Sequence, residues 1–600
     1  MDEFEEQSKL KGDHKIPFKI MFKRTMNYVK PEWKRFLLSF ILIIVNVALD
    51  IVLPLFIGNI TDNLGKISSN LYDLAEKSNL FKQIIFFTIC YFSISVVNQV
   101  FLYIESMLLQ KAGQQIIYNL RVEVFTHIEN MSQNQCDEMP VGSLVTRVCS
   151  YTASMSDLFT NVLVNVLKNA LTIIGVYVAM IIISPMLALI LLGFVVIVFI
   201  TSYFFSKVVG KTFRNERRYI SDLNTYLNEN LSGMKIIQIF NQQKYKEEEF
   251  IIKNEALRKA RYKIVIAFGI YRPFITLLYV LAIAVTFAMG ITLHLGAGSI
   301  VNFYLYLSKF FNPIQNLADQ LNNIQKSFSA SERLFNLLDV APEVKDSPDA
   351  IEIDQFEGHI EFKKVWFAYK ADNWILKDVS FEILPKQSCA FVGATGAGKT
   401  TILGLIVRNY EIQKGQILID GIDITKIKID SLRKAIGQML QDVFMFSGSV
   451  KSNITLNDDS ISDEKVMETC KYVNADSFIS KLPKGLNEEV IERGENFSQG
   501  QRQLLSFART VIHSPQILIL DEATANIDTE TEVLIQQSLE KIKSIGTMLV
   551  VAHRLSTIQK SDQIIVLQHG EIIERGTHQD LLKQKGYYYK LYQLQFEGRN

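Results

Sequence analysis

Cys389-Ala-Phe-Val392, Gly393-Ala-Thr-Gly-Ala-Gly-Lys-Thr400 and the apolar run 402–407 follow one another, and they decide the fold of the second half of the chain. The middle stretch, which we call the phosphate loop (393–400), matches G-x-x-x-x-G-K-[ST] between an apolar strand and an apolar helix. Its glycines allow backbone N–H groups to wrap phosphates at a helix N-terminus. Lys399 would supply positive charge to the β- and γ-phosphates, and the Thr400 hydroxyl would bind Mg²⁺.

Two further apolar runs end in polar residues. Ile517-Leu-Ile-Leu-Asp-Glu522 is predicted to be a buried strand, in which Asp521 holds Mg²⁺ through water and Glu522 polarises the attacking water. The run 547–552 ends at His553. A lone histidine is usually structural, but one at the carboxyl end of a strand in an α/β sheet is a candidate sensor of the γ-phosphate.

A third polar motif, Phe497-Ser-Gln-Gly-Gln501, is followed by Arg502, Gln503 and an apolar helical run. Small polar residues at the start of a helix cap its free N–H groups and favour a nearby anion. We therefore expect the N-terminus of this helix to face a negatively charged group.

The composition excludes some classes of protein. The chain has 600 residues, 48% of them hydrophobic and 21% charged, and its net charge is +1. Because the net charge is close to zero, we expect no nucleic-acid partner. The five cysteines show no C-x-x-C spacing, so they predict neither a disulfide nor a metal site. The first 30 or so residues are polar and charged, without the short apolar core of a cleavable signal.

The first half of the chain contains long apolar runs. A helix needs ~20 apolar residues to cross a bilayer, and a buried helix of a soluble protein rarely has runs of this length. We predict six spans, at residues 36–57, 80–109, 158–183, 186–205, 264–293 and 299–321. Asp50 lies well inside the first span, and two interpretations remain open for it: it faces cargo, or it forms a structural ion pair.

Lys and Arg predict how these spans are oriented. Seven of them lie between residues 15 and 35, and five between residues 207 and 218, whereas the turns at 184–185 and 290–299 have none. Positive residues concentrate on the cytoplasmic side, so both termini are predicted to be cytoplasmic. The long inner segments 111–157 and 207–262 are predicted to extend as helices into the cytosol, with apolar residues at helical spacing.

Taken in order, these motifs resemble the ATPase domain of ABC transporters, and with six spans fused in front the chain resembles a half-size exporter of the type IV, multidrug-exporter class. The resemblance covers roughly residues 15–595. It implies a multidomain fold: an α-helical transmembrane domain over 1–340 that begins with an elbow helix, a linker over 341–357, and an α/β P-loop ATPase domain over 358–600. It also implies a multi-pass protein of the plasma membrane with its ATPase domain in the cytoplasm.

The resemblance implies specific ligands and residue roles. Two such chains pair and enclose two ATP molecules with Mg²⁺. Each ATP lies between one chain's phosphate loop and the other chain's signature motif, which corresponds to residues 497–501 here. Glu522, His553 and Lys399 are implied as catalytic residues, and Thr400, Gln441 and Asp521 as Mg²⁺ ligands. Tyr369 is implied to stack on adenine, although an aromatic residue of the core is the alternative. Segments near 124–133 and 236–245 resemble coupling helices, and 491–495 resembles the loop that contacts the transmembrane half. The remaining residues implied to contact ATP are Gly393, Thr395, Gly396, Gly398, Thr401, Ser498, Gly500, Gln501 and Asp528.

One residue departs from the family pattern. The signature usually reads L-S-G-G-Q, whereas this chain has Phe497 and, in place of the first glycine, Gln499. Glycine permits close approach to a phosphate, and a glutamine side chain should hinder it. With Glu522 and His553 both present, this pattern indicates the catalytically complete chain of a heterodimer.

Several alternatives are consistent with the same motifs. The leading interpretation is ATP-driven export of small amphipathic cargo, drugs or lipids, from the lipid bilayer, by a chain paired with a second ABC half-transporter. A homodimeric flippase that tolerates Gln499 is the second. An ATP-gated channel or regulator is the third, and the presence of both Glu522 and His553 argues against it because gating does not need fast turnover.

Overall fold

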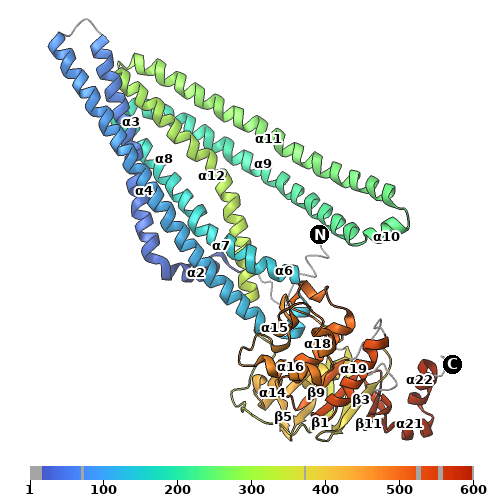
Figure 1. The fold of residues 1–600 in the computed structure, drawn as a ribbon. Coiled ribbons are helices and arrows are strands. Elements are labelled where there is room, and N and C mark those ends of the chain that lie inside the picture. Colours follow the sequence, from blue (N-terminus) through green and yellow to red (C-terminus); the bar gives the residue numbers. More distant parts are fainter. Residues whose placement is uncertain (1–15, 69–72, 371–372, 522–528, 552–557, 597–600) are drawn as a thin grey trace. The chain divides into compact units, whose positions relative to one another are not determined.

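The computed structural model describes residues 16–68, 73–370, 373–521, 529–551 and 558–596 (Figure 1). By contacts the chain divides into two compact units. The first contains Met1–Glu129 and Met139–Val340, and the second contains Asn130–Glu138 and Ala341–Asn600. The short helix α5 (Gln133–Asp137) therefore belongs to the second unit, where the side chain of Gln135 donates a hydrogen bond of 2.9 Å to the carbonyl oxygen of Ala341.

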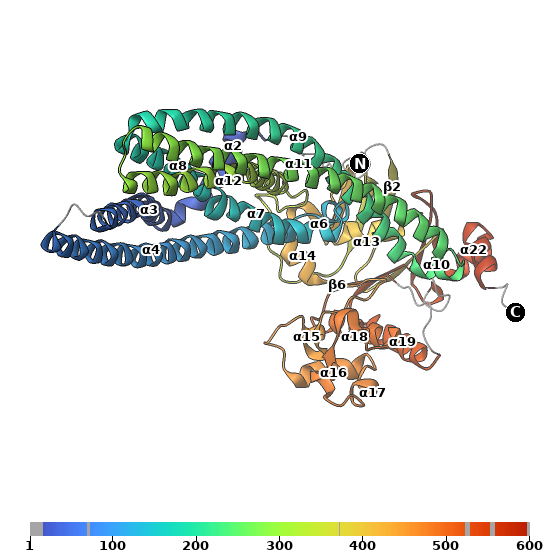
Figure 2. The ribbon, with the colours of Figure 1, turned by 90° about the horizontal axis from the view of Figure 1, so that it is seen from above.

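The first unit is entirely helical in the described residues. Its longest helices run as pairs: α3 lies beside α4, and α9 lies beside α11 with the short α10 at their far end (Figures 1 and 2). The elements in order are α2 (Phe18–Val29), a 3₁₀ turn (Lys30–Glu32), α3 (Trp33–Ser68), α4 (Leu74–Glu129), α6 (Val141–Thr146), α7 (Thr152–Asp157), α8 (Leu163–Ile183), α9 (Pro185–Ser232), α10 (Met234–Ile239), α11 (Gln243–Thr292) and α12 (Ala297–Leu338), with π-helical turns at Arg147–Tyr151 and Leu158–Val162.

Local chemistry explains the break between α8 and α9. Proline disfavours helical backbone in the residue before it and suits the first position of a helix. Ser184 accordingly adopts an extended conformation, with φ −155° and ψ 102°, and Pro185 opens α9. A single residue outside the helices, Ser184, is therefore enough to turn the chain from one long helix to the next.

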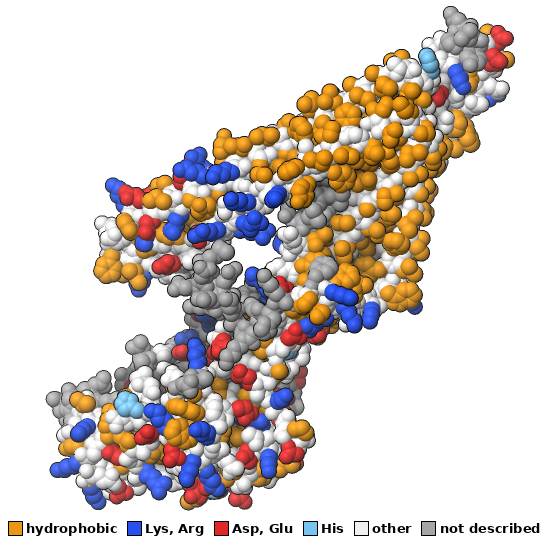
Figure 3. Space-filling model, turned by 180° about the vertical axis from the view of Figure 1, so that it is seen from behind, with side chains coloured by type: hydrophobic (Ala, Val, Ile, Leu, Met, Phe, Trp, Pro, Cys, Tyr) orange, Lys and Arg blue, Asp and Glu red, His pale blue; other side chains and the backbone are white. Residues whose placement is uncertain are grey.

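Five helical segments in the described residues are long and apolar enough to cross a membrane: Lys19–Ser68, Leu74–Glu129, Val141–Ile183, Pro185–Ser232 and Gln243–Thr292. Each of them overlaps one of the first five predicted spans, and α12 contains the sixth. Figure 3 shows hydrophobic side chains gathered over the surface of the long helices. Large apolar side chains exposed in such numbers are stable only against lipid or a partner. The predicted helical transmembrane region is therefore confirmed.

The second unit is built on two main sheets. Four antiparallel strands lie in the order β2-β1-β4-β5, and six strands lie in the order β12-β11-β3-β10-β9-β6, of which only the edge strand β12 is antiparallel. The strands are β1 (Ile360–Ala368), β2 (Trp374–Ile383), β3 (Ser388–Val392), β4 (Lys414–Ile419), β5 (Ile422–Asp423), β6 (Ile436–Met439), β9 (Ile517–Asp521), β10 (Thr547–Val551), β11 (Gln563–Gln568) and β12 (Glu571–Gly576), with a small pair β7 (Gly448–Ser449) and β8 (Glu489–Val490).

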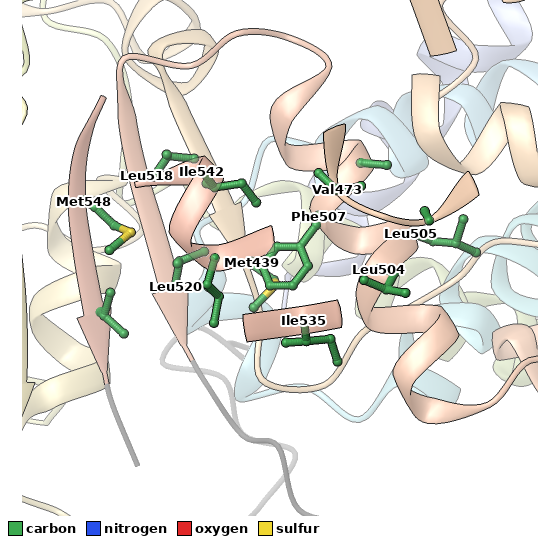
Figure 4. Packing of buried hydrophobic residues seen from close by; sticks show 14 of the residues in the cluster. Met439, Val473, Leu504, Leu505, Phe507, Leu518, Leu520, Ile535, Ile542 and Met548 are labelled. Carbon is green, nitrogen blue, oxygen red and sulfur yellow. The ribbon is translucent and has the colours of Figure 1, made fainter. Parts of the chain in front are cut away.

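Helices cover the six-stranded sheet, whose central strands are buried on both faces as expected for parallel strands. Figure 4 shows Phe507 of α18 packed among apolar side chains of β9, α19 and neighbouring elements. This packing fixes α18 against the sheet. The helices are α13 (Lys399–Ile406), α14 (Ile429–Ala435), α15 (Val450–Thr455), α16 (Asp463–Tyr472), α17 (Asp476–Ile479), α18 (Gln499–Val511), α19 (Thr529–Ile542), α21 (His578–Gln584) and α22 (Tyr587–Phe596).

Candidate functional site

The carboxyl ends of the central parallel strands lie side by side. In the register of the sheet, Val551 at the end of β10 pairs with Asp521 at the end of β9 and with Phe391 near the end of β3. The phosphate loop leaves β3 at this same edge. Ligands of open α/β sheets bind at the carboxyl edge, so the topology brings together motifs that are far apart in the sequence.

The glycines of the phosphate loop have backbone conformations that other residues rarely adopt. Gly396 has φ +81° and Gly398 has φ +100°. A Cβ atom on Gly398 would also lie only 2.7 Å from Cδ2 of Leu376 on β2. The loop therefore requires glycine here both for its left-handed backbone and for its close approach to the neighbouring strand.

The side chain of Lys399 folds back over the start of the phosphate loop. Its Nζ atom donates hydrogen bonds of 2.8 Å to the carbonyl oxygen of Gly393 and 3.0 Å to that of Ala394. Burial lowers the pKa of Lys399, and the nearby carboxylate of Asp521 opposes part of that shift. The structure thus holds one buried amine against two backbone carbonyl oxygens of the phosphate loop, a position from which it could bind an anionic phosphate chain.

A pocket of about 360 Å³ opens at this loop. It brings together nine of the residues that the sequence implied for nucleotide or Mg²⁺ binding, and it adds Ile375 of β2 and Val551 of β10. Both added residues are apolar strand residues, and the sequence carries no signal that sets them apart. The nine predicted lining residues are Tyr369, Thr395, Gly396, Gly398, Lys399, Thr400, Thr401, Gln441 and Asp521.

Tyr369 stands at the side of this pocket. Its hydroxyl lies 3.0 Å from Oγ1 of Thr401, and its ring packs edge-on against Phe367 and Tyr410, with centroids 4.9 and 5.2 Å away. The side chain is nevertheless 39% exposed. Tyr369 is therefore held in place by core aromatics while part of its ring remains accessible, so both sequence interpretations describe part of its environment.

The signature motif forms the N-terminus of α18. The backbone N–H of Gln501 donates to Oγ of Ser498 at 3.2 Å, and Oε1 of Gln501 accepts from the N–H of Ser498 at 2.9 Å, a complete capping box. Phe497, only 5% exposed, packs edge-on against Phe478 and so fills an apolar core position. The predicted capped helix N-terminus is therefore present.

Gln499 is exposed and Gly500 is buried. The side chain of Gln499 lines a second pocket of about 380 Å³ together with two arginines, Arg493 and Arg502. Gln441, one of the three residues predicted to bind Mg²⁺, borders both the pocket of the phosphate loop and the pocket of the signature motif. Arg493 lies within a segment that the sequence had assigned only to contacts with the transmembrane half.

Comparison with known proteins agrees with this architecture. Residues 36–314 match the ABC transporter transmembrane region, and residues 376–525 match the ABC transporter domain. The probable multidrug resistance ABC transporter ATP-binding/permease protein YheH of Bacillus subtilis is 37% identical over 84% of this chain and 76% of its own length. This chain belongs to the ABC transporter family. Like its relatives, it is a membrane ATPase chain of the exporter type.

Two further similarities support the same assignment. The ATP-dependent lipid A-core flippase of Syntrophus aciditrophicus is 33% identical over 82% of this ABC transporter chain and 83% of its own length. The structure of a bacterial Atm1-family ABC exporter with ATP bound superposes with a TM-score of 0.77 at 26% identity, over 94% of this chain and 98% of that one. The fold of the ABC transporter chain therefore agrees with that of an exporter along nearly its whole length.

Three residues implied by the family resemblance, Glu522, Asp528 and His553, lie outside the described residues of this ABC transporter. The strands that lead to two of them are described, and they end at Asp521 and Val551 beside the phosphate loop.

Asp50 of the ABC transporter has partners within the transmembrane unit. Its Oδ1 atom lies 3.2 Å from Nζ of Lys309 on α12 and accepts a hydrogen bond of 3.3 Å from Nδ2 of Asn98 on α4. Of the two interpretations left open by the sequence, this geometry supports the structural ion pair.

Proposed function

We propose that this chain is the catalytically complete half of a heterodimeric pump that uses ATP hydrolysis to export small amphipathic compounds, drugs or lipids, across the cell membrane. The observation that carries the proposal is the single pocket lined by nine residues of the implied nucleotide site. The alternative of a homodimeric drug or lipid flippase shares every step except the identity of the partner chain.

ATP fits the pocket by its chemistry. The phosphate loop supplies backbone N–H groups and the buried Lys399 amine, which would bind the phosphates. The hydroxyl of Thr400, the amide of Gln441 and the carboxylate of Asp521 are oxygen donors on the pocket wall, suited to Mg²⁺. When bound, Mg²⁺ would neutralise charge that develops on the phosphates. Glu522 would orient the attacking water, and His553 would contact the γ-phosphate.

The base and the opposite phosphate would be recognised at the margins of the site. The accessible part of the Tyr369 ring would stack on adenine. At the interface between the two paired chains, the signature motif would face the ATP that is bound by the partner chain. Its residues there are Ser498, Gly500 and Gln501, and the capped start of α18 presents free backbone N–H groups to an anion. Asp528 would lie at the same interface between the two chains.

The exposed surface of α10 supports a partner chain. Ile236, Ile239 and Phe240 are 63, 67 and 68% exposed in the single chain. Large apolar residues clustered at the polar end of α9 and α11, beyond the predicted spans, are typical of a docking surface. This segment overlaps the predicted coupling segment 236–245, so a second half-transporter is the partner we propose for it.

The membrane topology follows from charge. The Lys and Arg residues before α3 and after the fourth predicted span support a topology with both termini and the ATPase unit in the cytoplasm. The chain is thus proposed to lie in the plasma membrane. The names of the two curated relatives, a multidrug transporter and a lipid flippase, support cargo of an amphipathic kind.

The ATPase activity of purified complexes tests whether this chain needs an unlike partner chain. We expect this chain alone to hydrolyse ATP slowly and the chain with a second half-transporter that has an intact signature to hydrolyse it fast. In the pair, we expect the ATP site closed by this chain's signature motif (497–501) to turn over slowly. Gln499→Gly should alter nucleotide occupancy at that site and leave most turnover intact, while Lys399→Ala should abolish most of it. A fully active, stable dimer of this chain alone would contradict the heterodimer and leave the exporter assignment standing.

A further inference from the structure

Two hydrogen bonds connect α3 and α4 within the predicted spans. Nδ2 of Asn46 donates to Oε2 of Glu105 at 2.6 Å, and Nδ2 of Asn98 donates to Oδ1 of Asp50 at 3.3 Å. Asn46 and Asp50 are four residues apart and therefore lie on one face of α3. Asn98 and Glu105 are seven residues apart and lie on one face of α4. The two helices thus place two carboxylates and two amides along one shared, largely buried seam.

The two carboxylates differ in their charge balance. Asp50 is paired with Lys309 at 3.2 Å. Glu105 is only 4% exposed, and its one hydrogen-bond partner among the described residues is the neutral amide of Asn46. No Lys or Arg within the described part of the chain pairs with it. A buried, ionised carboxylate that has only a neutral partner is costly, and intramembrane acids therefore normally meet a positive group.

The side-chain oxygen of Asn46 is a second group in this seam that lacks a binding partner among the described residues. Asn46 is 1% exposed, and within the described residues its Oδ1 atom has no hydrogen-bond partner. As the amide is oriented in the structure, its nitrogen donates to Oε2 of Glu105 and its oxygen is left without a partner among the described residues. The orphaned oxygen belongs to the same amide group that contacts Glu105, so the two side chains together offer a buried carboxyl group and one free acceptor.

We propose that Glu105 and Asn46 bind a compact monovalent cation between α3 and α4: an alkali ion, or the primary ammonium group of a cargo molecule. The cation would neutralise Glu105 and contact Oδ1 of Asn46, which are oxygen ligands of the kind that hard cations prefer. Asn98, whose Oδ1 atom is also buried and without a partner among the described residues, lies one step further along the seam. The cargo part of this inference rests on the proposed export function.

The burial and the charge balance of the seam define which cations we expect it to bind. Asn46, Asn98 and Glu105 are 1, 3 and 4% exposed, so we expect the proposed site to admit a compact cation and not a bulky quaternary ammonium. Because Lys309 already neutralises Asp50, a single positive charge completes the balance and a divalent ion would exceed it.

The test is cation-dependent thermal unfolding of the full-length chain in complex with its partner half-transporter, without nucleotide. Ligands that bind only the folded state raise its unfolding temperature. NaCl, KCl and ethylammonium chloride are titrated at constant ionic strength and constant pH, with tetraethylammonium chloride as the bulky balancing salt. We expect a saturable rise in the unfolding midpoint with the alkali salts, with ethylammonium, or with both. A response only to the alkali salts assigns a free ion, and a response to ethylammonium assigns an amine group of cargo.

Three variants make the test specific. Glu105→Gln keeps the shape and the acceptor for Asn46 but removes the charge, so the rise should be lost. Asn46→Ala should raise the half-saturating concentration about tenfold, the loss of one contact to a charged group. Glu76→Gln removes an exposed acid at the start of the same helix and should respond like the parent.

An equal rise in the parent and Glu105→Gln would overturn the proposal. So would a midpoint that responds to pH but to none of the cations, which would assign a proton to Glu105. If Glu105→Gln fails to fold, an unchanged half-saturating concentration in Asn46→Ala overturns it instead. ATP turnover is measured in parallel: its absence in the parent complex would contradict the export function without affecting the binding result.

Discussion

The hydroxyl of Tyr369 lies 3.0 Å from Oγ1 of Thr401, so the loop after β1 is tied to the first turn of α13, directly behind the phosphate loop. A ring that binds adenine at this place would be fixed relative to the residues that bind the phosphates. The same contact separates two contributions of Tyr369, its ring and its hydroxyl, which can be removed one at a time.

We expect Tyr369→Ala to weaken ATP binding by about tenfold or more, because stacking of an aromatic ring on a base contributes roughly 1–3 kcal/mol. Tyr369→Phe keeps the ring and loses only the hydrogen bond to Thr401, so its ATP affinity should fall much less. Equilibrium binding of a fluorescent ATP analogue measures both. Unchanged affinity in Tyr369→Ala, with the fold intact, would assign the ring to the aromatic core formed with Phe367 and Tyr410.

Glu522 follows Asp521 directly, and it is the proposed general base. We expect Glu522→Gln to keep ATP binding and lose most turnover, because the amide preserves the shape and removes the basic oxygen. Phosphate release and ATP binding are measured on the complex with its partner chain. Glu468→Gln, which removes an exposed acid on α16 of the same unit, serves as the control. Near-normal hydrolysis by Glu522→Gln would disprove the assignment.

The ion pair between Asp50 and Lys309 joins α3 to α12. We expect Asp50→Asn to reduce transport of cationic and neutral compounds to a similar extent, since it leaves Lys309 without its carboxylate. The exchanged pair, Asp50→Lys with Lys309→Asp, should restore part of the activity. Transport assays in vesicles with a matched cationic and neutral compound measure whether the two transport rates fall together. A loss confined to the cation would instead support the other interpretation, in which Asp50 faces cargo.

His578 connects α21 to α22, with Nδ1 2.7 Å from the hydroxyl of Tyr588. Burial lowers the pKa of His578 and raises the pKa of Tyr588 to about 12, so the hydrogen bond joins a protonated tyrosine hydroxyl to a neutral imidazole. A lowered folded-state pKa means that the stabilisation is fully present above the unfolded value of about 6.5 and is lost as the pH falls through the folded value.

We therefore expect proteolytic cleavage near 577–596 to become faster as the pH falls below about 6.5. His578→Gln cannot titrate in this range and should show a flat profile. Asp580→Asn, on the same helix, should keep the pH dependence. A pH profile in His578→Gln identical to that of the parent would show that another group titrates.

Much of the candidate site could be predicted from the sequence, because its parts are local. The phosphate loop is encoded by contiguous residues: an apolar strand, glycines with positive φ and a helix that starts at Lys399. The capping box between Ser498 and Gln501 depends on a spacing of three residues. In both cases the backbone geometry follows from neighbours in the chain, so the pattern alone predicts the structure.

Other parts of the site depend on contacts that no local pattern encodes. Ile375 and Val551 line the same nucleotide pocket although they come from different sheets, Ile375 from β2 of the four-stranded sheet and Val551 from β10 of the six-stranded sheet. Arg493 reaches the pocket beside Gln499 from a loop outside the signature motif. The sequence likewise marked Phe497 only as a departure, whereas its side chain fills the core beside Phe478.

The sequence by itself determined the class of the protein: six apolar runs long enough for a bilayer, then strands and motifs of an ABC ATPase in order. Only the tertiary structure decided which intramembrane charges are balanced. The partner of Asp50 is Lys309, and the partner of Glu105 is Asn46, residues 259 and 59 positions away. Span length and motif order are properties of contiguous sequence, whereas charge pairing depends on how each helix is rotated and staggered against its neighbours, which packing of the whole unit determines.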